Sequence, residues 1–288
     1  MSLNNQDRSI WKRAGEILRY NRLFTLGLLI SSAFLMIALL APVLASVDPH
    51  EIDFKSKLEA PSLNHWFGTD ALGRDIFSRV LHGARTSLLT GVLVVFIAFM
   101  IGLPIGLTAG YYGGRVDMWL MRIADVFLAF PPLLLPIAIT AALGPSLYNA
   151  LMALAVSWFP WYARILRASV MSVKKELYVK SSQAMGMHPI RIMLKHVLPN
   201  STTPVVVQAS MDFGYTILAA ASLSFIGMGA RPPTIEWGLM ISTSRAIFLE
   251  FWWTAFFPGM AIFLLVLGVN LLGDGIRDIL DPHKSDTT

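Results

Sequence analysis

Five stretches without charged residues, one of them interrupted only by Asp212, most constrain how this chain of 288 residues can fold. Each is long enough for at least one α-helix of about 20 residues, the length that crosses the apolar core of a bilayer. The third stretch is too long for one crossing, and Gly144-Pro145 near its middle is a turn signal that divides it into two. The stretches are Leu23–Val47, Thr86–Gly114, Val126–Ala163, His196–Ala230 and Phe251–Gly273.

The stretches predict six transmembrane helices, at residues 23–47, 88–111, 118–142, 146–165, 204–227 and 251–272. The composition agrees, because 55% of the residues are hydrophobic and only 14% are charged. A soluble domain of this size would carry more charge. The expected fold class is therefore all-α, in a polytopic membrane protein.

The charges of the loops predict the orientation. The first 22 residues hold five basic and two acidic residues, and the segment from Arg164 to Asn200 holds seven basic residues against Glu176. Positive loops stay in the cytoplasm, so both termini and this segment are expected inside. Loops 48–85 and 229–250 have nearly balanced charges and suit the outer face. The net charge of +5 is accounted for by the inner loops and gives no support for nucleic-acid binding.

The first apolar stretch has an alternative interpretation as a signal peptide, because basic residues precede it. Its length of about 25 residues exceeds that of a signal core, and its Ala-Pro-Val-Leu-Ala-Ser ending is a weak cleavage site, so a retained first helix is expected. The chain has no cysteine, which excludes disulfides, thiolate metal sites and cysteine nucleophiles.

Only two ionisable residues are candidates for a role inside the membrane, Asp125 and Asp212. Asp125 follows Arg122 by three residues, so an interfacial ion pair or a contact between helices is the simpler interpretation, and a place on the transport pathway is the alternative. Asp212 either lines a hydrophilic pathway or a subunit interface, or makes a polar contact inside the bundle. No histidine falls inside a span, which argues against a proton relay or an intramembrane histidine metal site.

Glycine and proline mark two helices. Gly102, Gly106 and Gly110 lie on one face of the second span and predict close helix packing, inside this chain or against a second subunit. Pro131-Pro132 and Pro136 are expected to kink or interrupt the third span.

The segment Lys174–Pro199, called the loop segment below, is too polar to span a bilayer. A short helix is expected from Glu176 to Gln183, ended by Gly186, and a second from Pro189 to about His196. Ile190, Met193, Leu194 and Val197 form an apolar stripe on the second helix. The pair is amphipathic enough to dock into a groove of a partner; the alternative is a segment that lies on the lipid surface.

The loop segment resembles the EAA loop of ABC importer permeases. The similarity rests on Tyr178-Val179, Ala184-Met185-Gly186, Arg191-Ile192 and His196-Val197-Leu198-Pro199-Asn200. Ser181-Ser182 stands where that family usually has Ala-Ala, a departure that keeps small residues.

Three further regions are similar to the C-type subunit of the dipeptide, oligopeptide and nickel group of these permeases. They are Phe67–Asp70 with Gly73-Arg74-Asp75, Ser78-Arg79 and Gly83–Arg85; Ser224–Gly229 with Pro232-Pro233 and Glu236-Trp237-Gly238; and Phe257–Gly259 with Asn270–Gly275, Arg277-Asp278 and Asp281-Pro282. The four regions together cover nearly the whole chain.

The resemblance implies a type I ABC importer transmembrane fold and a place in the bacterial inner membrane. It also implies a B-type sister permease, two cytoplasmic ATPase subunits and an extracytoplasmic binding protein as partners, besides membrane lipid. The chain has no Gly-Lys dipeptide and therefore no Walker A loop, so it is not expected to be an enzyme. It is expected to bind no cofactor itself; ATP and Mg²⁺ belong to the partner ATPase.

The resemblance implies a coupling role for the loop segment, in which ATP binding to the partner turns the helices. The residues expected to carry it are Tyr178, Ser181, Ser182, Ala184, Gly186, Ile190, Leu194, Leu198 and Pro199. The expected division of the chain is 1–22, a cytoplasmic segment; 23–85, the first helix and outer loop; 86–283, a five-helix permease core with the loop segment; and 284–288, a tail.

The outer motifs each have two interpretations. Asp70, Gly73, Arg74 and Asp75 contact the binding protein or fold the loop, with Asp70 as the N-cap of a short helix across the outer mouth. Glu236 and Trp237 form a gate or an anchor at the headgroup level.

The resemblance implies di- or oligopeptides as the cargo, with nickel or a metal chelate as the alternative. A self-contained secondary transporter is a remote alternative, because the spans lack coupling charges apart from Asp125 and Asp212.

Overall fold

The computed structural model describes residues 21–280, and within this range the regular structure is helical. The one extended pairing among these residues is an isolated bridge between Thr69 and Asp75. The expected tail 284–288 and all but the last two residues of the expected segment 1–22 lie outside the described residues. The elements are α2 (Arg22–Leu44), η1 (Phe54–Ser56), α3 (Ile76–Tyr112), α4 (Gly114–Leu128), α5 (Leu134–Leu143), α6 (Leu147–Val173), α7 (Leu177–Ala184), α8 (Pro189–Ile192), η2 (Met193–Val197), α9 (Leu198–Ser201), α10 (Thr203–Phe225), α11 (Trp237–Ser244) and α12 (Trp253–Leu280).

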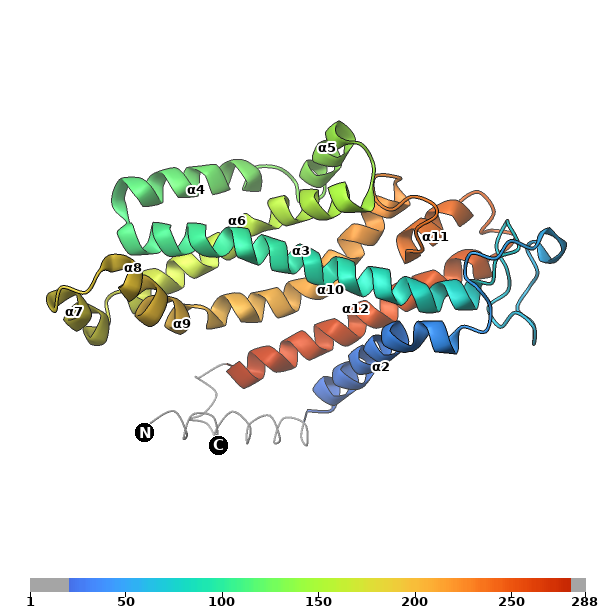
Figure 1. Ribbon diagram of the computed structural model, residues 1–288, viewed down its shortest axis with the longest axis horizontal. Helices are drawn as coiled ribbons and strands as arrows, with labels where there is room; N and C mark the ends of the chain where they lie inside the picture. The colour runs from blue at the N-terminus through green and yellow to red at the C-terminus, as the bar shows by residue number, and fades with distance from the viewer. Residues whose placement is uncertain (1–20, 281–288) are drawn as a thin grey trace.

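The long helices lie roughly along one axis of the molecule (Figure 1). α7 and α8 lie at one end, called the loop end below, and residues 45–75 cover the opposite end, called the far end. The chain passes between the two ends in α2, α3, the pair α4–α5, α6, α10 and α12. These helices correspond to the six predicted spans.

Four of these helices are long and apolar enough to cross a membrane: α2, α3, α10 and α12. α6 is 27 residues long but less apolar, and one of its faces is buried against its neighbours. The pair α4–α5 is interrupted. Burial of one face explains why α6 tolerates polar sequence. In α4 and α5 only Ala124, Pro136 and Thr140 are buried, so this pass is largely exposed.

α3 begins at Ile76, whereas the apolar pattern predicts a span from residue 88. The first turns therefore include Arg79, His82 and Arg85, which the charge pattern assigns to an outer loop. The Asp75 side chain accepts a hydrogen bond from the Ser78 N–H at 2.7 Å and starts the helix there. At 37 residues the helix is about 55 Å long and exceeds the thickness of a bilayer core.

The third pass is broken between Leu128 and Leu134, at Pro131-Pro132 as predicted. Proline lacks the N–H that an interior helical position donates, and it disfavours helical backbone in the residue before it. The third proline, Pro136, does not break α5, because it lies in the first turn, where the N–H has no partner to lose.

The glycine face of α3 packs against α6 of the same chain, which was the simpler of the two interpretations. A Cβ on Gly106 would lie 2.4 Å from the carbonyl oxygen of Ala163, and one on Gly102 would lie 2.7 Å from that of Phe159. Only glycine permits backbones to approach this closely.

α2 packs against α12, as expected of a retained first helix. A Cβ on Gly27 would lie 2.7 Å from the Leu271 Cβ, and Gly268 approaches Ile30 in the same way. The first apolar stretch is thus part of the helical bundle.

Candidate functional site

The loop segment folds as two short helices, α7 and α8, joined by a turn at Gly186, as the sequence predicts. α7 follows Glu176 as its N-cap residue, and Pro189 occupies the first turn of α8. Gly186 between them has φ = +75°, in the left-handed region that L side chains rarely adopt. Glycine at this position allows the chain to reverse.

The second helix does not end near His196 as predicted. α8 continues through a π-helical turn at Met193–Val197 into α9, and α10 follows after Thr202. Pro199 in the first turn of α9 explains why regular α-helical bonding is interrupted without ending the helix. The loop segment is therefore joined almost directly to α10.

The predicted apolar stripe divides between two surfaces. Met193 and Val197 are buried and pack, together with Ile192 and Val179, in a cluster that includes Val170 of α6. Ile190 and Leu194 are 55% and 56% exposed. Because one pair faces the core and the other is exposed, a single partner cannot contact all four side chains. The expectation of a single docking stripe was therefore wrong.

An apolar surface remains exposed at the loop end, called the loop surface below. It consists of Leu177, Tyr178, Met185, Ile190 and Leu194. Ser181, Ala184 and Gly186 are also exposed, and so are the basic residues Lys175, Lys180, Arg191 and Lys195. Exposed apolar side chains rimmed by charges are typical of a protein interface.

The remaining predicted coupling residues are placed differently from one another. Ser182 is buried and its hydroxyl donates to the Tyr178 carbonyl at 2.8 Å, so it is not part of the loop surface. Leu198 is half-buried against the core, and Pro199 is exposed. Of the Ser181-Ser182 pair, only Ser181 is open to a partner.

The loop segment is attached to the end of α3. The Lys174 ammonium donates to the Tyr111 carbonyl and lies 5.3 Å from the centroid of the Tyr111 ring. The Gln183 side chain donates to the Tyr111 hydroxyl at 3.4 Å. A displacement of the loop segment would therefore act on α3.

Two ion pairs join α4 to α6 near the loop end. Arg167 binds Asp117 through two nitrogens, and Arg164 binds Asp125. The predicted ion pair of Asp125 is thus formed, but with Arg164 of α6 instead of Arg122. The sequence spacing identifies neighbours within one helix and not those across two helices.

A cavity of about 680 Å³ lies at the break between α4 and α5. α6 contributes Ser157, Trp158 and Trp161, and α10 contributes Gln208, Asp212 and Tyr215. The remaining lining residues come from the break and its flanks, Phe127–Pro132 and Leu135. Asp212 is the only charged residue in this lining.

Asp212 was predicted from the sequence as a pathway or interface residue, whereas the aromatic residues around it were not predicted. The ring centroids of Trp158 and Tyr215 lie 5.3 Å apart, although 57 positions separate them in the sequence. One local signal was available, since Gln208 and Asp212 are four residues apart and share a helix face.

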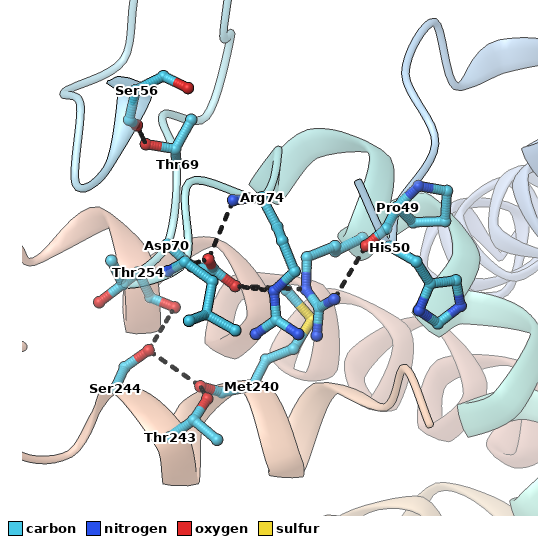
Figure 2. A network of polar contacts seen from close by, with 12 residues as sticks. Pro49, His50, Ser56, Thr69, Asp70, Arg74, Met240, Thr243, Ser244 and Thr254 are labelled. Carbon is cyan, nitrogen blue, oxygen red and sulfur yellow. Dashed lines mark hydrogen bonds and ion pairs between the residues drawn. The ribbon is translucent and has the colours of Figure 1, made fainter. Parts of the chain in front are cut away.

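The Asp70 motif folds the far end. Asp70 accepts hydrogen bonds from the N–H groups of Leu72 and Arg74, and its carboxylate lies 2.7 Å from the Arg74 Nε and 3.8 Å from the Arg79 Nε. The Arg79 guanidinium also donates to the Pro49 carbonyl at 2.9 Å (Figure 2). Asp70 does not cap a helix, because Asp75 performs that role for α3, so the predicted N-cap was wrong.

The left-handed turn at Gly73 belongs to the same fold. Gly73 has φ = +74°, and a Cβ there would lie 1.7 Å from the Asp53 carbonyl oxygen. Figure 2 shows how the Asp70 loop lies against Ser244 and Thr254. The Ser244 hydroxyl donates a hydrogen bond to the Thr254 carbonyl at 3.2 Å. The motif ties residues 45–75 to the helical bundle.

Glu236 and Trp237 are buried structural residues. Glu236 is the N-cap of α11 and accepts from the N–H groups of Gly238 and Leu239 at 2.8 and 2.9 Å. The Trp237 indole donates to the Val80 carbonyl of α3 at 2.9 Å and is 0% exposed. The expectation of an interfacial anchor was wrong, because a fully buried indole cannot reach the headgroups. Burial raises the pKa of Glu236, against the lowering effect of the two N–H donors.

No cluster of three or more His, Asp or Glu side chains suited to a metal ion occurs within residues 21–280. The polar groups described above instead serve packing, capping and the lining of one cavity.

Comparison with protein families gives two matches. The family described as binding-protein-dependent transport system inner membrane component matches residues 102–286, and the N-terminal domain of oligopeptide transport permease C matches residues 9–61.

Several named proteins are similar over most of the chain. The dipeptide transport system permease protein DppC of Alkalihalophilus pseudofirmus is 48% identical over 95% of this chain and 90% of its own. The probable D,D-dipeptide transport system permease protein DdpC of Escherichia coli is 48% identical over 86% and 83%. The glutathione transport system permease protein GsiD of Pectobacterium atrosepticum is 43% identical over 96% and 90%.

Solved structures share the fold at lower identity. An inward-facing structure of the MetNI methionine ABC transporter aligns with a TM-score of 0.56 and 20% identity, over 71% of this chain and 97% of that chain. A crystal structure of an amino acid ABC transporter with histidines aligns with a TM-score of 0.55 and 17% identity, over 69% and 92%.

Proposed function

Because the chain belongs to the family of binding-protein-dependent transport system inner membrane components, we propose that it is the C-type permease subunit of an ATP-driven peptide importer. It is a non-catalytic membrane subunit, and half of the translocation pathway is formed by its helices. A sister permease, ATPase subunits and a substrate-binding protein complete such systems.

The loop surface is the single observation that carries the coupling role. Five exposed apolar side chains lie together at one end of the molecule, on a segment held by the core through Val179, Met193 and Val197. A segment that is anchored on one face and apolar on the other is suited to receive a cytoplasmic protein. The proposed partner there is the ATPase, which binds ATP and Mg²⁺.

Peptides are the proposed cargo. The relatives named for dipeptide and glutathione transport support this choice over nickel, the alternative that the sequence left open. The absence of a metal cluster within residues 21–280 carries no weight here, because the binding protein does most of the selecting in such systems.

The proposed cycle uses the loop segment as a lever. Closure of the ATPases would move α7 and α8, and the contacts of Lys174 and Gln183 with Tyr111 would pass this movement to α3. The loop end is then cytoplasmic, as are both termini, and the far end with the Asp70 motif faces the binding protein.

Single-cysteine cross-linking tests this assignment, since the natural chain contains no cysteine. Leu194→Cys should cross-link to the ATPase in the assembled importer, because Leu194 lies on the loop surface. Leu63→Cys is the matched control: Leu63 is 94% exposed and belongs to residues 45–75, the segment of the far end. It should be labelled by a membrane-impermeant maleimide added outside and should not cross-link to the ATPase.

The reverse pattern of labelling would contradict the orientation.

Uptake of a dipeptide by proteoliposomes that contain the complete importer should require ATP. Uptake that continues without ATP would favour the secondary-transporter alternative and contradict the proposed function.

A further inference from the structure

Within residues 21–280, Asp212 is the one carboxylate that lines the cavity at the break between α4 and α5. It lies in α10 beside the break between α4 and α5, and it is partly exposed. The cavity volume of about 680 Å³ falls within the ~300–1,000 Å³ usual for small-molecule sites. The space is therefore sufficient for a short peptide.

The carboxylate of Asp212 has a polar partner but no cation. Gln208 donates to it at 2.9 Å, from one turn earlier on the same helix. Among residues 21–280, Asp212 takes part in no ion pair, whereas Asp117 and Asp125 are each bound by an arginine of α6. The contrast matters because an uncompensated charge at membrane depth is costly and is retained for a function.

A buried tyrosine hydroxyl lies beside Asp212. The Tyr162 side chain is 0% exposed, and its hydroxyl makes no hydrogen bond of ordinary geometry within the described residues, although it lies next to Asp212. A buried hydroxyl in this condition usually has a water or ligand as its partner. Tyr162 is not one of the lining residues, so Asp212 is the member of this pair that a ligand in the cavity can reach.

The rest of the lining suits a cation. Trp158 and Tyr215 form a pair of rings with centroids 5.3 Å apart, and Trp161 is 51% exposed. The faces of Trp and Tyr rings attract ammonium groups, more strongly where water is excluded. A carboxylate surrounded by aromatic rings is a favourable environment for an ammonium ion.

We infer that the cavity binds the terminal ammonium group of a peptide in transit, with Asp212 as the residue that selects for it. This inference rests on the proposed function, since a peptide with a free N-terminus is protonated near neutral pH. The same chemistry could be supplied by a Lys or Arg of the sister permease, and the experiment below distinguishes the two sources.

The test measures equilibrium binding of three probes to the complex of both permeases and the ATPases, in nanodiscs without the binding protein. The probes are dialanine, dialanine amide, which keeps the ammonium group, and N-acetyl-dialanine, which lacks it. Dialanine and its amide should bind the wild-type complex about 10-fold to 100-fold more tightly than the acetylated peptide, the effect of one hydrogen-bonded charge.

Variants locate the selectivity. Asp212→Asn keeps the shape and should bind all three probes alike, whereas Asp212→Glu should retain part of the preference. Asp274→Asn is the matched control, because Asp274 is exposed on α12 and lies outside the cavity lining. This variant complex should prefer the probes with an ammonium group as strongly as the wild-type complex does.

The wild-type arm decides the matter even if a variant does not assemble. Equal binding of dialanine and N-acetyl-dialanine, or no dialanine binding at millimolar concentration, would overturn the inference. Loss of the sister permease from the Asp212→Asn complex, together with equal probe binding by the wild type, would identify a cation of the sister subunit instead. In each of these cases ATP-dependent dipeptide uptake would leave the proposed function intact.

Discussion

The roles of three acidic residues follow from what surrounds their carboxylates. Asp70 lies beside Arg74 and Arg79, and Glu236 accepts from two backbone N–H groups. Both hold the far end together. Asp212 has only the uncharged side chains of Gln208 and Tyr162 beside it and faces a cavity. The first two residues are structural, and the third is available to a ligand.

The buried Glu236 should make stability depend on pH. Its pKa is raised above the ordinary value of 4.5, because burial disfavours the charged form more than the N–H donors favour it. As the pH rises from 4.5, the unfolded chain releases this proton before the folded one does, so the contribution to stability is present below 4.5 and declines above it.

Glu236→Gln should remove this dependence, since glutamine keeps an acceptor for the helix N-terminus without titrating. The melting temperature of the wild-type complex should fall relative to the variant as the pH is raised from 4.5. Glu250→Gln, at an exposed position, should follow the wild type. Parallel curves for wild type and Glu236→Gln would contradict the prediction.

The effect of a substitution at Gly186 should depend on whether the new residue can adopt the left-handed backbone conformation, and not on the size of its side chain. A Cβ there would meet nothing within 4 Å, but φ is +75°. The left-handed conformation costs an L residue about 1–2 kcal/mol, less for asparagine and more for a β-branched residue. Gly186→Val should therefore lower peptide-stimulated ATP hydrolysis by the complex several-fold, and Gly186→Asn should lower it little. Equal losses in both variants would indicate that the partner itself requires glycine.

At the scale of elements, the bundle is organised around the close pair α3 and α6. Gly102, Gly106 and Gly110 bring the two backbones together, and α6 in turn binds α4 through Arg164 and Arg167. α6 is the least apolar of the unbroken passes because neighbouring helices cover it. Hydropathy alone underrates such a helix.

Gly106→Ala should destabilise the fold. The added Cβ would lie 2.4 Å from the Ala163 carbonyl oxygen, so the helices must separate, at about 1–3 kcal/mol. Gly259→Ala in α12 is the control, because its Cβ would meet only the Ile241 Cδ1 at 3.9 Å. Thermal unfolding of the purified complex should show a lower midpoint for Gly106→Ala and an unchanged or higher one for Gly259→Ala. A midpoint for Gly106→Ala equal to the wild type would contradict the close packing.

Element boundaries were predictable only where the signal is local. The break at Pro131-Pro132 and the turn at Gly186 follow from single-residue geometry, and both are present. The start of α3 was missed by twelve residues, because Arg79 and Arg85 are charged. Asp70 and the Pro49 carbonyl satisfy Arg79 there, and neither is its neighbour in the helix.

At the scale of the molecule, α3 connects the two ends. It begins at the Asp75 cap beside the far-end network and ends at Tyr111 and Tyr112 beside the loop segment (Figure 1). A continuous helix of this length offers a direct route by which ATPase movement at the loop end reaches the mouth at the far end. The attachment of Lys174 to Tyr111 is the joint in that route.

Removing this joint should uncouple transport from ATP hydrolysis. Lys174→Met keeps most of the side-chain volume but loses the hydrogen bond and the contact of the charge with the ring, so uptake per ATP hydrolysed should fall several-fold. Arg115→Met removes an exposed charge at the start of α4, outside the loop surface, and should leave the ratio unchanged. The ratio is measured in proteoliposomes from paired uptake and phosphate release. Equal ratios in the two variants would exclude Lys174 from coupling.

The sequence by itself determined the six passes, the basic loop segment and the places where helices break or turn, because apolar length, proline and glycine act on the backbone locally. The tertiary structure decided which groups meet. It divided the stripe of the loop segment into a buried and an exposed face, and it paired Asp125 with Arg164. It also placed Asp212 beside rings from two distant segments, α6 and the break between α4 and α5. Such partners depend on how helices pack against one another, and helical periodicity within one segment does not contain that information.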